Sequence, residues 1–226
     1  MKILGFIPAR GGSKGVPGKN KKLLNGQPLI QYTLHAALQS ALAGIVVSSD
    51  DEEILQLAMQ AGVHAVKRPE QFATDLAPTL QALQHAVANT AGQYDAVMTL
   101  QPTSPLRKTR HINEAIELFA NDPAADSLVS VVQAPHKFTG NSLMVQAGNY
   151  IKPAHDGELV LRRQDKPVLW GRNGAAVYIT RMQRITEYIF GGNILPYQMT
   201  KSESIDIDDM EDWKMAEALL QYENRM

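Results

Sequence analysis

The most restrictive feature of this sequence is a regular alternation of short apolar runs with segments of helical periodicity. Most of the runs are continuously apolar, as expected of strands that are covered on both faces. The runs predicted to be strands are Ile3–Pro8, Gly44–Ser48, His64–Lys67, Ala96–Leu100, Ser127–Val132 and Ala175–Ile179. Strands that alternate with helices form βαβ units. The pattern therefore predicts an α/β fold with a doubly wound, mainly parallel sheet.

The segments between these runs carry signals of helix ends. Pro28 opens one helix, and Asp50 and Asp51 can cap the next, which ends at Gly62. Further helices are predicted at Pro78–Ala91, His111–Phe119 and Asp209–Tyr222.

The alternation breaks between Ala134 and Arg172, where turn residues surround short β-like pieces. We predict that residues 1–133 and 173–226 form one α/β domain and that residues 134–172 form an inserted subdomain. The insertion is too short to bury a core of its own, so its apolar side chains need another surface. They are Phe138, Leu143, Met144, Val145, Leu159, Val160 and Leu161. Because helices already cover its own sheet, a symmetric partner is the natural surface, and a homodimer is expected.

Composition excludes several classes of function. The chain of 226 residues has a formal net charge of −1, which argues against a general binder of nucleic acid or of anionic membranes. It contains no cysteine, so disulfides, thiolate metal sites and cysteine nucleophiles are excluded. No apolar run approaches the length of a membrane span, and the N-terminus lacks the pattern of a signal peptide. A cytoplasmic location is therefore expected.

A loop rich in glycine and basic residues, PARGGSKGVPGKN, includes the end of the first predicted strand and continues beyond it. Glycines let backbone N–H groups approach phosphate oxygens, and Arg10, Lys14 and Lys19 add positive charge. Such a loop can hold a triphosphate and stabilise a departing pyrophosphate. It contains neither the Walker A pattern nor G-x-G-x-x-G, so a dinucleotide fold is disfavoured. The alternative is a mobile surface loop with solvated lysines.

An acidic motif, SIDIDD, precedes the last predicted helix. In an extended strand the side chains of Asp206 and Asp208 share a face, and two carboxylates on one face suit Mg²⁺ or Mn²⁺. The alternative is an acidic first turn that stabilises the following helix. Both interpretations hold together if Asp209 is the cap and the other two aspartates bind the metal.

A second polar loop, LQPTSPLR, follows the predicted strand Ala96–Leu100. Two prolines fix its backbone and leave Gln101, Thr103, Ser104 and Arg107 at the carboxyl end of the strand. The alternative is a helix N-cap, provided by Ser104 or Thr109.

Five motif regions, in order along nearly the whole chain, resemble those of the CMP-N-acylneuraminate synthetases, also called acylneuraminate cytidylyltransferases. They are PARGGSKGVPGKN, RPEQFATD, LQPTSPLR, the pair RRQDKP and RNGAAVYI, and SIDIDD. The resemblance implies an enzyme that activates a nine-carbon 2-keto-3-deoxy sugar acid, N-acetylneuraminate or a related nonulosonate, with CTP and releases pyrophosphate. Legionaminate, pseudaminate and Kdo cytidylyltransferases are the alternatives among enzymes. A nucleotide-binding regulatory protein is the alternative outside them, although the intact SIDIDD motif speaks against it.

The resemblance also assigns residues to the ligands. Those expected at the nucleotide are Ala9, Arg10, Gly11, Ser13, Lys14, Lys19, Asn20, Arg68, Asp75, Ala77 and Thr79. Those expected at the sugar acid are Gln101, Thr103, Ser104, Lys137, Arg163, Asn173 and Tyr178. The catalytic set is Arg10, Lys14, Lys19, Asp206 and Asp208, and the last two are expected to bind the divalent metal.

Some of these assignments have open alternatives. Asp75 can instead cap a helix. Lys137 and Arg163 are expected to cross a two-fold dimer to the neighbouring site, but each can also be a solvated surface charge. Arg172 stands one residue before Asn173, whereas one pattern of the family, R-P-N-G, places the arginine two residues before the asparagine. The role of Arg172 therefore stays open.

Overall fold

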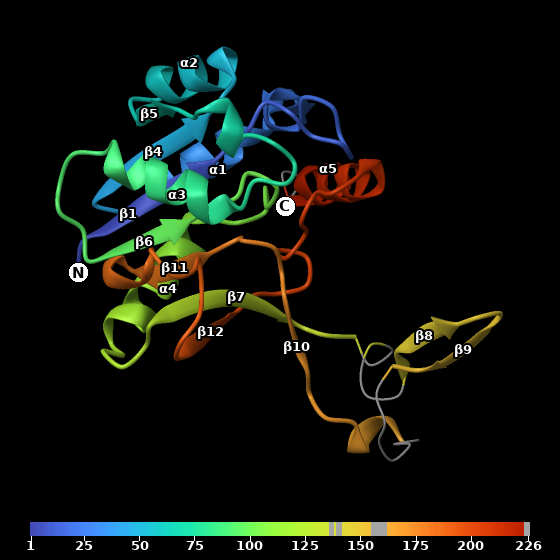
Figure 1. Ribbon diagram of the computed structural model, residues 1–226. Helices are drawn as coiled ribbons and strands as arrows, with labels where there is room; N and C mark the ends of the chain where they lie inside the picture. Colours follow the sequence, from blue (N-terminus) through green and yellow to red (C-terminus); the bar gives the residue numbers. More distant parts are fainter. Residues whose placement is uncertain (136–137, 139–141, 155–161, 224–226) are drawn as a thin grey trace.

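A computed structural model describes residues 1–135, 138, 142–154 and 162–223, and a mixed sheet forms its centre (Figure 1). Within the described residues, the main path of the sheet has the order β10-β7-β11-β6-β1-β4-β5, and β12 pairs with β7. In chain order these strands are β1 (Ile3–Pro8), β4 (Gly44–Ser49), β5 (His64–Lys67), β6 (Ala96–Thr99), β7 (Ser127–Gln133), β10 (Trp170–Arg172), β11 (Tyr178–Arg181) and β12 (Ile194–Gln198).

The sheet is mainly parallel, as predicted. Strands β5, β4, β1 and β6 run parallel to one another, and β12 runs parallel to β7. Strand β11 lies antiparallel between β6 and β7, and β10 is also antiparallel to β7. The sequence pattern did not identify β10 or β12, which are short or interrupted by polar residues and proline.

The predicted strand Ala175–Ile179 is displaced, because the observed strand β11 begins at Tyr178. The preceding residues, 173–177, form a loop that leaves the sheet between β10 and β11. Ser130 closes this loop: its N–H donates to the carbonyl of Val177, and its hydroxyl accepts the N–H of Val177 at 3.0 Å. The apolar run AAV is buried in this loop rather than in a strand, so its hydrophobicity alone was misleading.

The helices cover both faces of the sheet, which confirms the doubly wound fold. They are α1 (Leu29–Leu38), α2 (Glu52–Gln60), α3 (Thr79–Ala88), α4 (Thr109–Ala120) and α5 (Met210–Glu223). Ile3 and Ile7 of β1 belong to a core with α1, α2 and α4, whereas Leu4 and Phe6 pack with α3 on the other face.

Local signals explain where several of these helices begin and end. Asp51 caps α2 by accepting N–H groups from Glu53 and Ile54, and Gly62, with φ 76°, follows its end. Helix α4 begins two residues before the predicted start because the ring of His111 accepts the N–H of Lys108 and so forms part of the cap.

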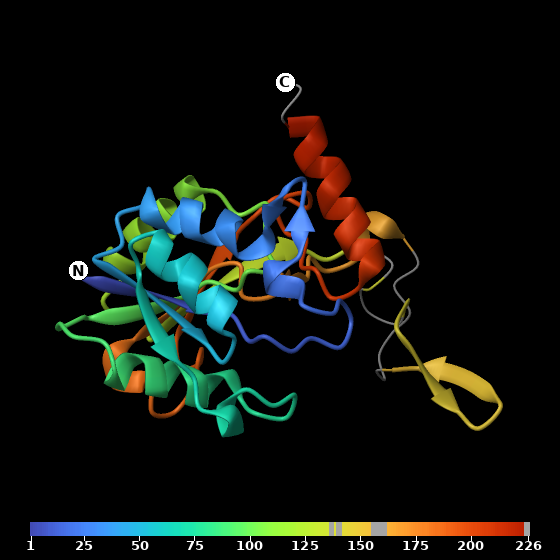
Figure 2. The same ribbon diagram turned by 90° about the horizontal axis from the view of Figure 1, so that it is seen from above.

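Two small hairpins complete the described structure. Strands β2 (Leu23–Leu24) and β3 (Gln27–Pro28) flank an Asn-Gly turn. Strands β8 (Met144–Ala147) and β9 (Tyr150–Pro153) form a hairpin that projects away from the main body (Figures 1 and 2). Strands β8 and β9 lie within the predicted insertion, residues 134–172, and β10 near its end pairs with the main sheet.

Strands β2 and β3 instead follow the glycine-rich loop. The division into domains stays a prediction, as does the place of Leu159, Val160 and Leu161, which lie outside the described residues.

A third, smaller core joins the two ends of the chain. Val16 of the glycine-rich loop packs there with Leu24, Leu29, Ile207 and Trp213. In Figure 2, α5 stands at one side of the main body, next to the segment that contains β2 and β3. This core brings the acidic segment, residues 204–209, against the loop that follows β1.

Candidate active site

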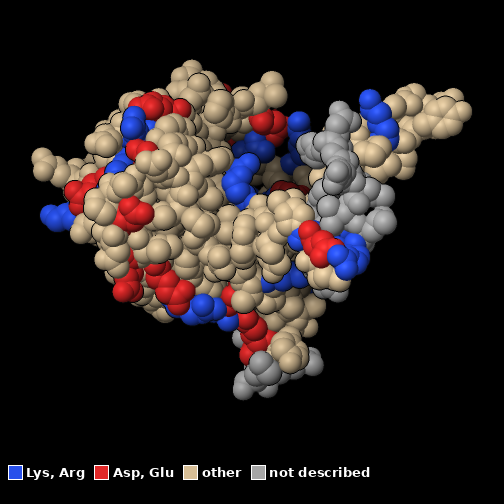
Figure 3. All heavy atoms as spheres, turned by 90° about the horizontal axis from the view of Figure 1, so that it is seen from below, with Lys and Arg blue, Asp and Glu red and all other residues tan. Residues whose placement is uncertain are grey.

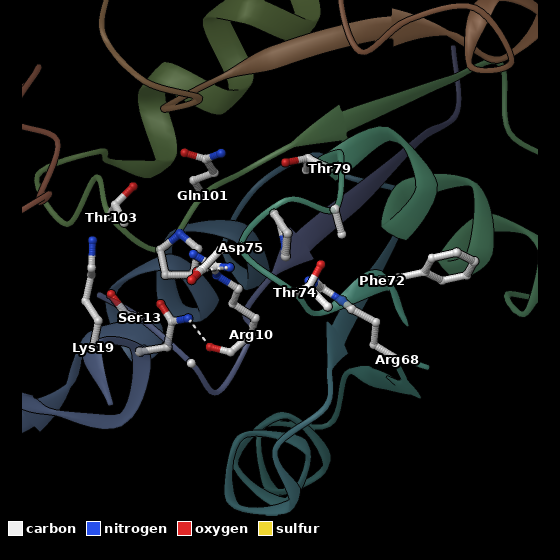
Figure 4. Close-up of a pocket in the computed structure, with 15 residues that line it drawn as sticks. Arg10, Ser13, Lys19, Arg68, Phe72, Thr74, Asp75, Thr79, Gln101 and Thr103 are labelled. Carbon is white, nitrogen blue, oxygen red and sulfur yellow. Dashed lines mark hydrogen bonds and ion pairs between the residues drawn. The ribbon is translucent and has the colours of Figure 1, made fainter. Parts of the chain in front are cut away.

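A cavity of about 270 Å³ lies among the loops that follow β1, β5 and β6, where an α/β sheet usually binds its ligand (Figure 4). The predicted residues that line it are Arg10, Ser13, Lys19, Asn20, Arg68, Asp75, Ala77, Thr79, Gln101 and Thr103. In space-filling form, basic side chains border a recess on one face of the molecule (Figure 3). The loops were predicted separately from three motifs, and the fold brings them together.

Other predicted nucleotide residues lie outside this lining. Ala9 is fully buried in the core of the sheet. Gly11 packs against Asp51, the N-cap of α2, and its N–H donates to a carboxylate oxygen of Asp50 at 2.9 Å. Lys14 does not line the cavity but forms an ion pair with Asp75, which does.

The glycine-rich loop is held in place at several points. The side-chain amide of Asn20 donates to the carbonyl of Arg10 at 2.8 Å and so ties the two ends of the loop together (Figure 4). Lys21 pairs with Asp51 at 2.9 Å. Lys19 is 9% exposed and donates through Nζ to the carbonyl of Ile207 at 2.5 Å. The picture of a loop with solvated lysines therefore fits Lys14, whose side chain is 80% exposed, but not Lys19.

The acidic segment is docked between two loops of the cavity. The N–H of Ile207 donates to the carbonyl of Thr103 at 2.8 Å, and its carbonyl accepts from Lys19. Its side chain is fully buried in the small core. Gly15 lies so close to the segment that an added Cβ would be 1.9 Å from the carbonyl oxygen of Asp208. The alternation of isoleucine and aspartate thus anchors Ile207 and leaves an aspartate on each side of it.

Asp206 and Asp208 differ in their surroundings. Asp206 is partly buried, and within the described part of the chain its Oδ1 has no hydrogen-bond partner. Burial raises the pKa of Asp206; the neighbouring carboxylate of Asp208 adds to this, whereas Thr103 and Lys19 oppose it. Asp208 is exposed. A partly buried carboxylate with an unpaired oxygen beside a second carboxylate fits a hard divalent cation.

The protein supplies few metal ligands. In the ranges that the structure describes, no group of three or more His, Asp or Glu residues is placed to hold a metal ion. A cation on Asp206 and Asp208 would therefore take its other ligands from water and from phosphate oxygens, as Mg²⁺ commonly does.

Asp209 has the capping role that the sequence allowed. Its carboxylate accepts N–H groups from Glu211 and Asp212, and Asp212 in turn accepts the N–H groups of Asp208 and Asp209. This reciprocal arrangement is a capping box at the start of α5. The cap and the proposed metal pair are therefore separate parts of one motif.

A second hollow, of about 240 Å³, adjoins the first and shares Thr79 and Gln101 with it. Its other lining residues are Thr99, Arg172, Gly174, Ala175, Tyr178, Ile189 and Phe190. The guanidinium of Arg172 lies 4.4 Å from the ring centroid of Phe190, and the ring of Tyr178 meets Phe190 edge-on. Burial raises the pKa of Tyr178, and Arg172 opposes that effect. Arg172 therefore belongs to this hollow.

Two residues expected at the sugar acid are buried away from both hollows. Asn173 is buried, and its Nδ2 donates to the hydroxyl of Ser204 at 2.9 Å, so it holds the start of the acidic motif. Ser104 is fully buried beneath the second polar loop and does not cap α4, whose N-cap position is Lys108. Neither residue lines the two hollows.

The other expected residues fall into two groups. Tyr178 lines the second hollow, Thr103 the first, and Gln101 both. Lys137 lies outside the described residues, and only the backbone of Arg163 is described, in a short 3₁₀ helix at Arg163–Asp165. The expected roles of Lys137 and Arg163 stay predictions.

Two buried arginines hold the backbone around the site by hydrogen bonds. Arg107 donates to the carbonyls of Gln101 and Ala176, each at 3.0 Å, and to the hydroxyl of Thr33, while burial lowers its pKa to about 9. Arg68 donates to the hydroxyl and carbonyl of Ser48, and burial lowers its pKa to about 10. Sequence reasoning identified both as polar groups near the site but not these partners. No sequence pattern identified Phe190 as a residue of the site.

The fold and this site define a protein of the nucleotidyltransferase type, in which a basic loop faces a pair of carboxylates across the end of a doubly wound sheet. Residues 4–225 match the family described as Cytidylyltransferase, and the chain belongs to that family. The resemblance inferred from the motifs is confirmed.

Two relatives show how far the similarity extends along the chain. The chain is 33% identical over 235 residues to an N-acylneuraminate cytidylyltransferase of Escherichia coli, and the match covers 99% of this chain and 53% of that protein. It is 36% identical over 229 residues to a CMP-N,N'-diacetyllegionaminic acid synthase of Legionella pneumophila, with 98% and 97% covered. The chain thus spans about half the length of the first relative and nearly all of the second.

A solved structure has the same fold. A CMP:2-keto-3-deoxy-manno-octonic acid synthetase, complexed with CTP, matches with a TM-score of 0.75 at 20% identity. The match covers 99% of this chain and 100% of that one. At this identity the likeness concerns the fold alone.

Gly15→Ala is expected to destabilise the protein. The added methyl group would overlap the carbonyl of Asp208, and overpacking of this kind typically costs about 1–3 kcal/mol. Urea denaturation measures the free energy of unfolding. Gly12→Ala is the matched control, since an added Cβ there meets nothing within 4 Å. Equal free energies for the two variants would contradict the close packing of the loop on the acidic segment.

Proposed function

We propose that the protein transfers the cytidylyl group of CTP to a nine-carbon 2-keto-3-deoxy sugar acid, N-acetylneuraminate or a related nonulosonate. The observation that carries the proposal is the place of Asp206 between the two hollows. Asp206 directly precedes Ile207, whose N–H donates to the carbonyl of Thr103 in the basic cavity, and it packs on Gly174 of the second hollow, where an added Cβ would lie 2.3 Å from its Oδ2. A carboxylate at this border lies where two ligands, one in each hollow, would meet.

The basic cavity is assigned to the nucleotide. Arg10, Lys14 and Lys19 supply the charges for a triphosphate, and Lys19 retains donors beyond the one used by Ile207. These cations would hold the β- and γ-phosphates and stabilise the pyrophosphate as it leaves. Thr79, Ala77 and Arg68 line the same cavity and are assigned to the nucleoside end.

The second hollow is assigned to the sugar acid. Gln101, Arg172 and Tyr178 offer an amide, a guanidinium and a phenol, which suit hydroxyl, carboxylate and carbonyl groups. In the proposed reaction the anomeric hydroxyl attacks the α-phosphorus and gives up its proton, a new oxygen–phosphorus bond forms, and the bond to pyrophosphate breaks. Mg²⁺ or Mn²⁺ on Asp206 and Asp208 would offset negative charge on the phosphates and orient them.

The names of the relatives favour a nine-carbon acid but do not agree on which one. One relative is named for N-acylneuraminate and another for N,N'-diacetyllegionaminic acid. Legionaminate, pseudaminate and Kdo therefore remain the alternative substrates, and a regulatory protein that binds nucleotide without turnover is the alternative outside enzymes. Among the described residues, no helix has the length and apolar character needed to cross a membrane. A cytoplasmic location stays part of the proposal.

Pyrophosphate release tests this function directly. CTP, GTP, ATP and UTP are each combined with N-acetylneuraminate, legionaminate, pseudaminate or Kdo in the presence of Mg²⁺. We expect release with CTP and a nine-carbon acid, and little with the other nucleotides. Binding of CTP without release from any of these acids would favour the regulatory alternative.

The proposed assembly is a homodimer with shared sites. Its support is the projecting hairpin, on which Met144, Val145, Tyr150 and Ile151 are exposed, with Tyr150 at 81%. Exposed apolar groups on a projecting hairpin need a partner surface. The segments with Lys137 and Arg163 adjoin this hairpin in sequence and are proposed to reach the neighbouring sugar site.

Asp206→Asn and Asp208→Asn are each expected to lower turnover by about 10²-fold or more, because a hard cation needs anionic oxygen ligands. The Mg²⁺ concentration for half-maximal rate should rise in both variants. Asp209→Asn is the matched control, since asparagine caps a helix as well as aspartate does. Wild-type rates for both metal-pair variants at limiting Mg²⁺ would contradict the metal assignment.

Mixing inactive variants tests the shared site. Dimers of Asp208→Asn and of Arg163→Ala are dissociated, mixed and reassembled, and partial activity should return because one site of each hybrid has both residues intact. Asp208→Asn mixed with Lys14→Ala is the control, since both residues belong to the same proposed site and no intact site can form. No recovery from demonstrably mixed dimers, or full activity of a monomer, would contradict sharing.

A further inference from the structure

Asp75 occupies the two cations to which the proposed function assigns phosphate. Its Oδ1 lies 2.7 Å from Nη1 of Arg10, and its Oδ2 lies 3.0 Å from Nζ of Lys14. Figure 4 shows Asp75 over Arg10 in the middle of the cavity. The two carboxylate oxygens are thus divided between the two bases, in the way that two oxygens of a phosphate would be.

The expected alternative for Asp75, a helix cap, is wrong. Helix α3 begins at Thr79 after Pro78, and no side chain caps it. Lys14 and Arg10 hold the pKa of Asp75 below its ordinary value, so the group is charged at neutral pH. Asp75 is therefore a negative charge at the centre of a cavity whose basic side chains suit an anionic ligand.

The residues next to Asp75 are exposed and contribute little to the core. Arg68 fixes one end of its loop by hydrogen bonds to Ser48, and α3 fixes the other end. Between them Asp75 and Leu76 are exposed, with Leu76 at 93%. Exposed ion pairs are weak, so a ligand that offers several phosphate oxygens can replace the carboxylate.

We propose that Asp75 is an internal competitor for the phosphate subsite of Arg10 and Lys14, and that it sets how tightly this site holds any phosphate anion. The proposal rests on the proposed function, which assigns these cations to phosphate. A triphosphate displaces the carboxylate because it also reaches Lys19. When pyrophosphate leaves, the carboxylate returns to the two bases, which favours release of the product.

A role for Asp75 in organising the two bases for the ligand predicts the opposite sign. If the carboxylate fixed Arg10 and Lys14 in a productive position, its removal would weaken phosphate binding. If it competes, its removal strengthens binding. The direction of the change therefore separates the two roles.

Calorimetric binding of pyrophosphate, with EDTA present to remove divalent metal, tests the proposal. The proteins are the wild type, Asp75→Asn, Asp75→Ala and the control Glu70→Gln. Glu70 lies on the same loop, is exposed and does not line the cavity, so this variant makes the same charge change outside the site. We expect both Asp75 variants to bind pyrophosphate roughly 2- to 30-fold more tightly, the factor that corresponds to loss of two exposed ion pairs, and Glu70→Gln to match the wild type.

Arg10→Ala and Lys14→Ala distinguish a failure of the competition by Asp75 from a failure of the phosphate site itself. If these variants lose pyrophosphate binding but the Asp75 variants bind no more tightly than the wild type, competition by Asp75 is wrong and the phosphate site stands. If pyrophosphate binding does not depend on Arg10 or Lys14, or if no protein binds it, both the phosphate site and the inference are overturned. Equal tightening by Glu70→Gln would reduce the effect to general charge and would also overturn the inference.

Discussion

The site depends on the main chain of Ile207, which is held between a lysine and a loop backbone. Its carbonyl accepts from Nζ of Lys19, and its N–H donates to the carbonyl of Thr103. Three segments far apart in the sequence meet through this one residue, and its buried side chain keeps them together. Because alternate residues of an extended chain point in different directions, burying Ile207 leaves the aspartates beside it free to face ligands.

The same arrangement places the basic side chains of the site next to its carboxylates. Lys19 is buried against the acidic segment, whereas Arg10 and Lys14 share the single carboxylate of Asp75. Asp206 has an unpaired oxygen, in the part of the chain that is described, and burial disfavours its charged form. A ligand that brings both phosphate and a divalent cation would satisfy the bases and the carboxylates together.

Sequence patterns predicted the layers of the fold and the loops of the site, but not the backbone connections between them. Continuous apolar runs located β1 and β6, because both strands are buried along their length. The run before β11 failed as a strand signal because the hydroxyl and amide of Ser130 hold it in a buried loop. Arg107 and Asn173 were recognisable as polar groups near the site, yet their hydrogen bonds to backbone and to Ser204 depend on tertiary contacts that no local pattern contains.

The central claim is that the basic loop and the acidic pair form one site for a metal-bound triphosphate. A crystal structure of the protein with CTP and Mn²⁺, with the metal located by its anomalous scattering, tests this claim most directly. The account predicts a manganese peak at Asp206 and Asp208, with the triphosphate in the basic cavity next to Arg10 and Lys19. A triphosphate bound outside that cavity, or a manganese ion that contacts neither aspartate, would contradict it.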